Sequence, residues 1–432
     1  MKTAPIISLI FVVSFCLTAV GGASEKYPQL THLLEEADSN NPSLLAAFEQ
    51  IAVARSIKDQ VASLADPVLS LSLSNYPIDE LQPDISPMTG NEVRLAQQFP
   101  FPGKLDSKGK IAAQKSRWFT SAYQDARLQI RQKVKDAWYR LIFQKQAIGL
   151  TSRNLELLED FIRLTETRYE VGKGLQQNVL KAHLQRSKQL DKLLMLQQQQ
   201  EATLAELNSL IGRQTDQTLL IPEPLDPPSI NYSLSDLKMQ AEQNRPMYAA
   251  FDALIDQYKE QRTLAELDYR PDFTLWAGYR FRDNGLADGG TDFVSAGLSF
   301  NLPVRRAKRA AAVAETDSSL RMAYQKRSDF NNKVQLAIHR SLSKLEQSTQ
   351  LVDLYRNGII PQATQTFQAT LSAYQVDKVD FLTLLDSVMS LYQYEIDHAR
   401  TLSEQQRSLA ELEAAAGLEI NQLKKTATPA EG

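Results

Sequence analysis

The residue types that carry out chemistry are few and widely separated in this chain of 432 residues. No two histidines have the spacing of three or four residues that would bring them together on one helix face. The one cysteine, Cys16, lies in the N-terminal segment, so no Cys/His zinc set remains. There is no glycine-rich phosphate loop, and the carboxylates are scattered over predicted helices, where we expect them to face solvent. The sequence therefore predicts no catalytic, cofactor-binding or metal-binding residues, and no enzyme. The four histidines are His32, His183, His339 and His398.

The charge and the N-terminus indicate an exported protein. The net charge is −3 at pH 7, without the basic excess that nucleic-acid partners require. Lys2 precedes an apolar run at residues 6–20, which is too short to cross a membrane as a helix. We therefore expect residues 1–23 to be a signal peptide. No later segment is apolar enough for a membrane helix, so a membrane crossing would require strands.

The chain repeats itself with offsets of 201–205 residues. We predict a first repeat at 24–220, a proline-rich linker at 221–233, a second repeat at 234–420 and a disordered tail at 421–432. Each repeat is predicted to contain a helix, two strands, a very long helix, a turn and a returning helix. The matching segments are Asn41-Pro42 with Arg245-Pro246, Pro67 with Pro271, 99–103 with 300–304, 169–173 with 374–378, and 210–212 with 415–417.

Four segments alternate between apolar and polar residues, at about 67–77, 91–101, 271–282 and 292–301. Their length suits tilted membrane-spanning strands, and aromatic residues near their ends suit the two membrane interfaces. A small soluble sheet with one wet face would show the same alternation. The residues expected to face lipid are Leu69, Leu71, Leu73, Leu95, Leu275 and Leu298.

The number of strands predicts an assembly. Four strands cannot close into a barrel, and an open sheet edge is not tolerated in lipid. Two chains would give eight strands and an interior filled by side chains, whereas three chains would give twelve strands and a duct. The sequence therefore favours a trimer.

The helices are long enough to cross the periplasm. Residues 103–171 contain no internal proline and are predicted to form one coiled-coil-like helix about 100 Å long. A first helix at 28–65 and a returning helix at 175–211 would together match that length. In the second repeat we expect a break at 357–361, before Pro361. The fold class is therefore mainly α with a β-barrel contribution: antiparallel coiled-coil helices and four membrane strands per chain. Three chains would form a twelve-stranded barrel above an α-helical tunnel.

This ordered pattern resembles the TolC family of outer-membrane efflux proteins. The segments 169–175 with 178–182, and 374–382 with 384–386, are similar to the two helix-hairpin turns of that family. The resemblance implies a passive exit duct, a homotrimer in the Gram-negative outer membrane that extends into the periplasm. It would dock on a periplasmic adaptor and an inner-membrane pump. The segment 97–104 is similar to the branch that serves metal-cation pumps. The tip residues implied to contact the adaptor are Val171, Gly172, Lys173, Gly174, Asp377, Lys378 and Val379.

Two positions depart from the family pattern. Asp377 stands where the family usually has glycine, which predicts a differently shaped turn. Thr383 and Asp386 stand where some members have two aspartates near the closed end of the tunnel. We therefore expect a periplasmic gate formed by Asp386, Thr383 and Asp380, with one acidic ring instead of two.

An alternative function class is a periplasmic coiled-coil structural or adaptor protein, which would have the helices and lack the barrel strands. Heat-modifiable migration of the outer-membrane fraction on a gel separates the two. The sequence leaves the cargo open between metal cations, drugs and proteins.

Overall fold

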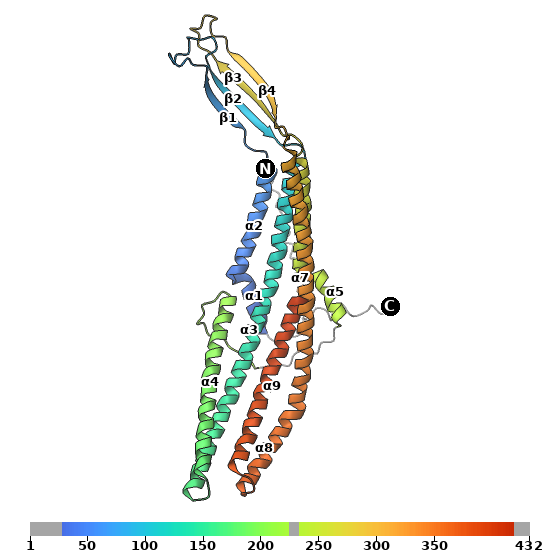
Figure 1. The fold of residues 1–432 in the computed structure, drawn as a ribbon. Coiled ribbons are helices and arrows are strands. Elements are labelled where there is room, and N and C mark those ends of the chain that lie inside the picture. Colours follow the sequence, from blue (N-terminus) through green and yellow to red (C-terminus); the bar gives the residue numbers. More distant parts are fainter. Residues whose placement is uncertain (1–27, 224–232, 419–432) are drawn as a thin grey trace, which may run out of the picture.

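The computed structural model describes residues 28–223 and 233–418. The predicted signal peptide, the predicted tail and most of the predicted linker lie outside these residues. The molecule is elongated, with a small antiparallel sheet at one end and two helix-hairpin turns at the other (Figure 1). In the described part of the chain, no helix has both the length and the apolar character needed to cross a membrane.

The helices of the first repeat bundle around α3 (Lys104–Glu170), which is continuous over 67 residues and so about 100 Å long. Its bounds differ by one residue at each end from the predicted helix. The antiparallel helix α4 (Gln176–Leu210) lies along its lower half, and α2 (Pro42–Ala62) lies along its upper half (Figure 1). The expected pairing of two shorter helices with one long helix is therefore present.

The prediction of one helix over residues 28–65 was wrong. The structure has two helices, α1 (Pro28–Asn40) and α2, which are separated at Asn41. Pro42 has no N–H to continue a helix and drives the preceding residue toward extended backbone, and Asn41 indeed has ψ 118°. The Asn41 side chain accepts hydrogen bonds from the first N–H groups of α2. Arg245 before Pro246 separates α5 (Leu234–Asn244) from α6 (Pro246–Leu267) in the same way.

The matched dipeptides hold each repeat together. The Nδ2 atom of Asn41 donates to the carbonyl of Leu210 at 2.8 Å, at the last residue of α4. The Nη1 atom of Arg245 donates to the carbonyl of Ala415 at 3.4 Å, near the end of α9 (Phe381–Ala416). Both bonds satisfy a carbonyl that the end of a helix leaves without an intrahelical partner. The repeated sequence pairs are thus repeated contacts.

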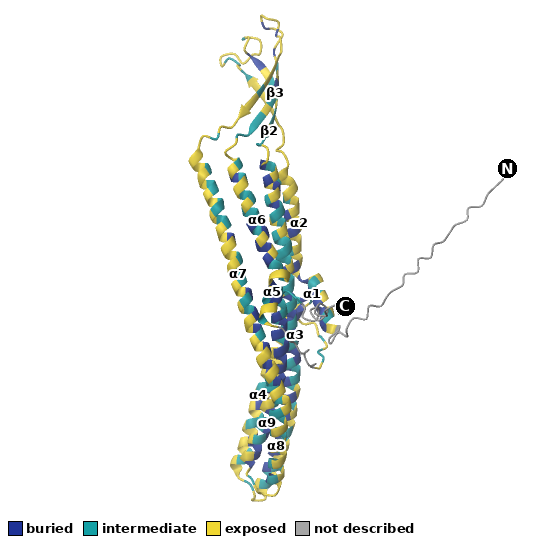
Figure 2. Ribbon diagram, turned by 90° about the vertical axis from the view of Figure 1, so that its right-hand side faces the viewer, coloured by how far each residue is buried: buried dark blue, intermediate teal, exposed yellow. Residues whose placement is uncertain are grey.

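The second repeat contains α7 (Arg306–Leu354), a π-helical turn η1 (Tyr355–Ile359), α8 (Ile360–Gln375) and α9. The expected break near Pro361 was therefore wrong, because the chain widens by one π turn and stays helical. Proline has no N–H to pair with a carbonyl of the preceding turn, and its ring would clash with that carbonyl. A single π turn widens the backbone enough to accommodate the proline without ending the helix. Exposed and half-buried residues predominate along α7 (Figure 2).

The sheet has the order β1-β2-β3-β4, and every neighbouring pair is antiparallel. The strands are β1 (Val68–Ser74), β2 (Gly90–Phe99), β3 (Phe273–Phe281) and β4 (Phe293–Phe300). They lie within the four predicted segments or one residue beyond them. The central pair, β2 with β3, joins the two repeats, while β1 and β4 lie at the edges.

The apolar core consists of separate clusters along the bundle. Each repeat has its own cluster near the middle of the bundle, around Trp138 in the first repeat and Ile338 in the second. Two further clusters lie where α3 and α4 meet α9, and the one near the tips is centred on Phe381. The sheet has no such core, and most of its residues are exposed or half-buried (Figure 2).

Candidate functional site

The sheet has one apolar and one polar face. Strand register aligns Leu69, Leu95 and Ala277 in one row across β1, β2 and β3. Leu71 lies in the next row and Leu275 in the row on the other side. Because side chains alternate between the faces of a strand, all six residues expected to face lipid lie on this one face. Each is more than half exposed in the single chain, from 52% for Leu95 to 75% for Leu73.

The opposite face carries the charged residues of the strands. Glu92 lies directly across from Arg280, with 3.7 Å between Oε2 and Nη2. Arg94 stacks on Trp276, with the guanidinium carbon 3.5 Å from the ring centroid. A sheet with leucine on one face and serine, arginine and tryptophan on the other suits a barrel wall between lipid and water.

The two hairpin turns have the same backbone shape. Gly172 has φ +74° and Asp377 has φ +59°, so both are left-handed. In each turn this residue donates its N–H to the carbonyl three residues back, and the next residue donates to the carbonyl five residues back. These bonds measure 2.8–3.2 Å and form the Schellman arrangement that ends a helix. The expectation of a differently shaped turn at Asp377 was therefore wrong. Aspartate is among the few residues besides glycine that adopt this conformation readily.

The remaining tip residues surround these two positions. Val171, Lys173 and Lys378 are exposed, and Gly174 and Val379 are half-buried. The turns lie at the end of the molecule furthest from the sheet (Figure 1).

Arg168, which the sequence analysis did not identify, links the two turns within one chain. Its Nη1 atom donates to Oδ1 of Asp377 at 2.5 Å, and its Nη2 atom donates to the carbonyl of Tyr374 at 3.2 Å. The guanidinium also stacks on the Tyr374 ring, 4.4 Å from the centroid. The signal available in the sequence was the position of Arg168 one turn before the first tip, but its partner lies 209 residues away.

The three residues of the expected gate have different surroundings. Asp380 begins α9, and its Oδ1 atom accepts a 2.8 Å bond from the N–H of Thr383. Hydrogen bonding from Thr383 holds the pKa of Asp380 below its usual value. Asp386 lies further along α9, is exposed, and makes no hydrogen bond or ion pair to any other described residue. It lines an open polar groove of about 460 Å³ between α8 and α9, together with Thr366, Thr370 and Thr383.

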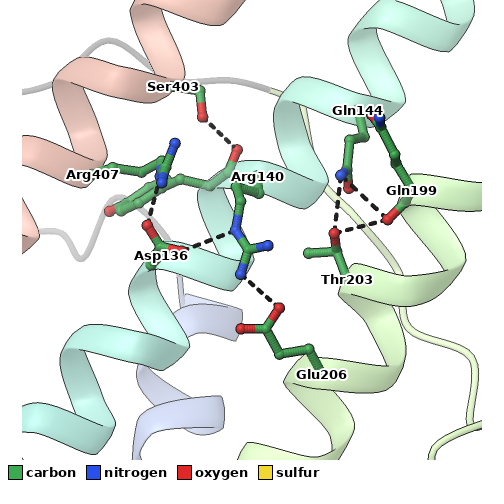
Figure 3. A network of polar contacts seen from close by, with 9 residues as sticks. Asp136, Arg140, Gln144, Gln199, Thr203, Glu206, Ser403 and Arg407 are labelled. Carbon is green, nitrogen blue, oxygen red and sulfur yellow. Dashed lines mark hydrogen bonds and ion pairs between the residues drawn. The ribbon is translucent and has the colours of Figure 1, made fainter. Parts of the chain in front are cut away.

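A polar network links α3, α4 and α9 near the middle of α3 (Figure 3). Asp136 of α3 accepts a 2.6 Å bond from Nε of Arg407 on α9 and a 2.9 Å bond from Nε of Arg140. Arg140 in turn donates to Glu206 of α4 at 2.8 Å. The expectation that the helical carboxylates face solvent is therefore wrong for Asp136, which is 19% exposed, joins α3 to α9 directly and is linked to α4 through Arg140. Nearby, Gln144 of α3 donates to the Thr203 hydroxyl of α4.

The described residues contain no group of three or more His, Cys, Asp or Glu side chains that could hold a metal ion. His183 lies 3.2 Å from Glu166 on the surface of the first hairpin. His32 is likewise exposed and lies 3.8 Å from Glu36.

Residues 33–213 match the family model for outer membrane efflux proteins. Among curated proteins, the chain is 24% identical to the pyoverdine export outer membrane protein OpmQ of Pseudomonas putida. That alignment spans 90% of this chain and 86% of the relative.

Solved structures with the same fold include two outer-membrane proteins. VceC of Vibrio cholerae aligns with a TM-score of 0.77 and 19% identity over 91% of this chain and 97% of its own. The outer-membrane channel OprN aligns with a TM-score of 0.74 and 20% identity over 91% of both chains. The predicted fold class is thereby confirmed. The family match in the first repeat and this shared fold together make the chain similar to outer membrane efflux proteins and to outer-membrane channels.

Proposed function

We propose that three copies of the chain form the passive exit duct of a tripartite efflux system, with a periplasmic adaptor bound at the tips and an inner-membrane pump behind it. The observation that carries the trimer is the four-stranded sheet, in which the outer sides of the edge strands β1 and β4 pair with no other strand of the described chain. Its apolar face belongs in lipid, where unpaired backbone groups cost several kcal/mol each. Pairing β1 of one copy with β4 of the next gives the backbone N–H and C=O groups of both edges hydrogen-bond partners. The exposed side of α7 is also available for contact with a neighbouring copy. In this proposal residues 1–23 are the leader, the two repeats are the units of the duct, and outer-membrane lipid surrounds the apolar face.

Cysteines on the two edge strands test the trimer. Ser72→Cys in β1 and Ser295→Cys in β4 lie at opposite edges of one sheet, so they cannot meet within a chain. Each β1 cysteine, Ser70→Cys or Ser72→Cys, is combined with each β4 cysteine, Ser295→Cys or Ser299→Cys. Oxidation of at least one of these pairs is expected to yield covalent dimers and trimers. Each single-cysteine variant serves as the control, because one cysteine per chain cannot link three chains into a covalent trimer. Monomers alone from every pair would contradict the closed barrel.

The tips are proposed as the adaptor-binding surface because they are exposed and lie opposite the sheet (Figure 1). A photo-crosslinker placed at Lys173 or Lys378 is expected to capture the periplasmic adaptor in intact cells. A crosslinker at exposed Lys110, near the sheet end of α3, is the matched control and should not capture it. Adaptor captured only at Lys110 would place the docking surface at the wrong end.

Asp386 is proposed as the charged ring of the periplasmic gate. Three unpaired carboxylates held near one axis would attract cations. Asp386→Asn is therefore expected to reduce cation preference and block by multivalent cations in single-channel recordings. Asp380→Asn is the contrasting variant, because that carboxylate caps α9 and its loss should affect stability more than selectivity. Unchanged selectivity in Asp386→Asn would assign it to the plain surface of the helix.

For the cargo we propose small organic molecules, the class to which the pyoverdine handled by the relative belongs. The metal-cation branch was suggested by the segment 97–104 alone. The last residue of that segment, Lys104, forms ion pairs with Asp268 and Asp272 at the joint between sheet and helices. These ion pairs give Lys104 a structural role at the joint. They give no reason to assign a metal cargo.

A further inference from the structure

The polar face of the sheet carries one positive charge that has no ion-pair partner among the residues that the structure describes. Glu92, Arg94 and Arg280 are the charged residues within the four strands, and all three lie on this face. Glu92 and Arg280 are directly opposite and form an ion pair. Arg94 makes no ion pair with any described residue. The face therefore has a net charge of +1 per chain, located at Arg94.

Arg94 is held in place by an aromatic platform. Its guanidinium lies 3.5 Å from the centroid of Trp276, and its Nε atom is buried without a hydrogen-bond partner. The indole in turn occupies the space beside Gly297, the residue paired with Trp276 on β4. A Cβ atom at position 297 would stand 2.5 Å from the indole ring, so only glycine leaves room for it. The Trp276 ring therefore lies close against β4 at Gly297, and the Arg94 guanidinium stacks on the Trp276 ring.

This stacked pair has the chemistry of an anion site. Stacking occupies the flat side of the guanidinium and leaves its in-plane N–H groups for a carboxylate, which the fork can bind through two hydrogen bonds. The indole adds a rigid apolar surface for the carbon skeleton of a ligand. Ser70 is paired with Arg94 in the strand register, so a hydroxyl lies on the same face beside it.

We propose that Arg94 and Trp276 form a binding site for carboxylate-bearing small organic molecules on the lumen wall of the barrel. The proposal rests on the proposed trimer, which turns the polar face inward and brings three copies of the pair around one lumen. Rings of arginine or lysine are a known means of favouring anions in a pore. The site therefore selects acidic cargo after it has left the helical tunnel.

Recordings from purified trimers in planar bilayers test this site, with potassium citrate as the carboxylate probe. The wild-type channel is expected to be blocked by citrate added from the barrel side. In Arg94→Gln the concentration for half block should rise about tenfold, the size expected when one charged hydrogen-bonding partner is lost. Arg94→Lys keeps the charge but not the fork, so it should still be blocked by citrate, with binding several-fold weaker than in the wild type.

The matched control is the double variant Glu92→Gln/Arg280→Gln. It removes the neighbouring ion pair, keeps the net charge of the face and leaves Arg94 on Trp276, so half block should stay within about twofold of the wild type. Heat-resistant trimer on unheated gels shows that each variant has assembled. Citrate block of Arg94→Gln equal to the wild type, or block lost equally in the double variant, would overturn the site. A wild-type trimer that forms no channel would instead overturn the proposed duct.

Discussion

Leu95→Arg is expected to remove most of the folded trimer from the outer membrane. Leu95 lies in the middle row of the apolar face, with two rows of side chains above it and two below. An arginine at the bilayer midplane costs roughly 2–4 kcal/mol, and a trimer would incur this cost in every chain. The readout is the amount of heat-resistant trimer in the outer-membrane fraction on unheated gels.

Two further variants separate lipid contact from general damage. Leu275→Arg lies one row nearer the helices, so its cost should be smaller, because the penalty falls toward the interface. Ser72→Arg places the same side chain on the polar face opposite Glu92, where it should be tolerated. Equal trimer levels for Leu95→Arg and Ser72→Arg would contradict the assignment of the apolar face to lipid.

The elements that were predicted closely from sequence are those whose signals are local. The long helix α3 begins after Gly103, which has φ +95°, and ends just before left-handed Gly172. Both glycines are visible in the sequence, and no proline lies between them. The strands were found because alternation with period two is also local. The break at Asn41 also has a local signal, because Pro42 has no N–H with which to continue a helix.

Partners far apart in the chain could not be predicted in this way. Asp136 and Arg407 are 271 residues apart, and the sequence gives no reason to pair them rather than any other carboxylate and arginine. The same applies to Arg168 with Asp377 and to Arg94 with Trp276. Such pairs follow from how the second repeat packs on the first. Helix and strand periodicity fix only the face on which each residue lies.

Lys104→Met is expected to cost about 3 kcal/mol of stability at neutral pH, near the low end of the range for breaking a buried ion pair. Lys104 lies at the joint between sheet and helices, and its side chain is 7% exposed. Its Nζ atom lies 3.0 Å from Oδ1 of Asp268 and 2.9 Å from Oδ1 of Asp272. The same Asp272 oxygen accepts the N–H of Phe101, so the ion pair also orients the last residues before α3. Loss of the ammonium leaves the mostly buried Asp272 without a counter-charge.

The pH dependence of this difference distinguishes the ion pair from simple packing. Burial alone would lower the pKa of Lys104, but hydrogen bonds and charge from Asp272 and Asp268 outweigh it and raise that pKa. Burial would raise the pKa of Asp272, but hydrogen bonds from the Phe101 N–H and from Lys104 outweigh this effect and lower that pKa.

Lys104, whose pKa is raised, stabilises the fold below pH ~10.4 and loses this effect as the pH rises through its folded pKa. Asp272, whose pKa is lowered, stabilises the fold above pH ~3.9 and loses this effect as the pH falls through its folded pKa. The gap in trimer melting temperature between wild type and Lys104→Met should therefore be constant between about pH 4 and 10 and narrow below that range. Asp268→Asn, which alters the half-exposed partner, should cost less than about 1 kcal/mol. A gap that stays constant into acid would assign the role of Lys104 to its hydrocarbon stem.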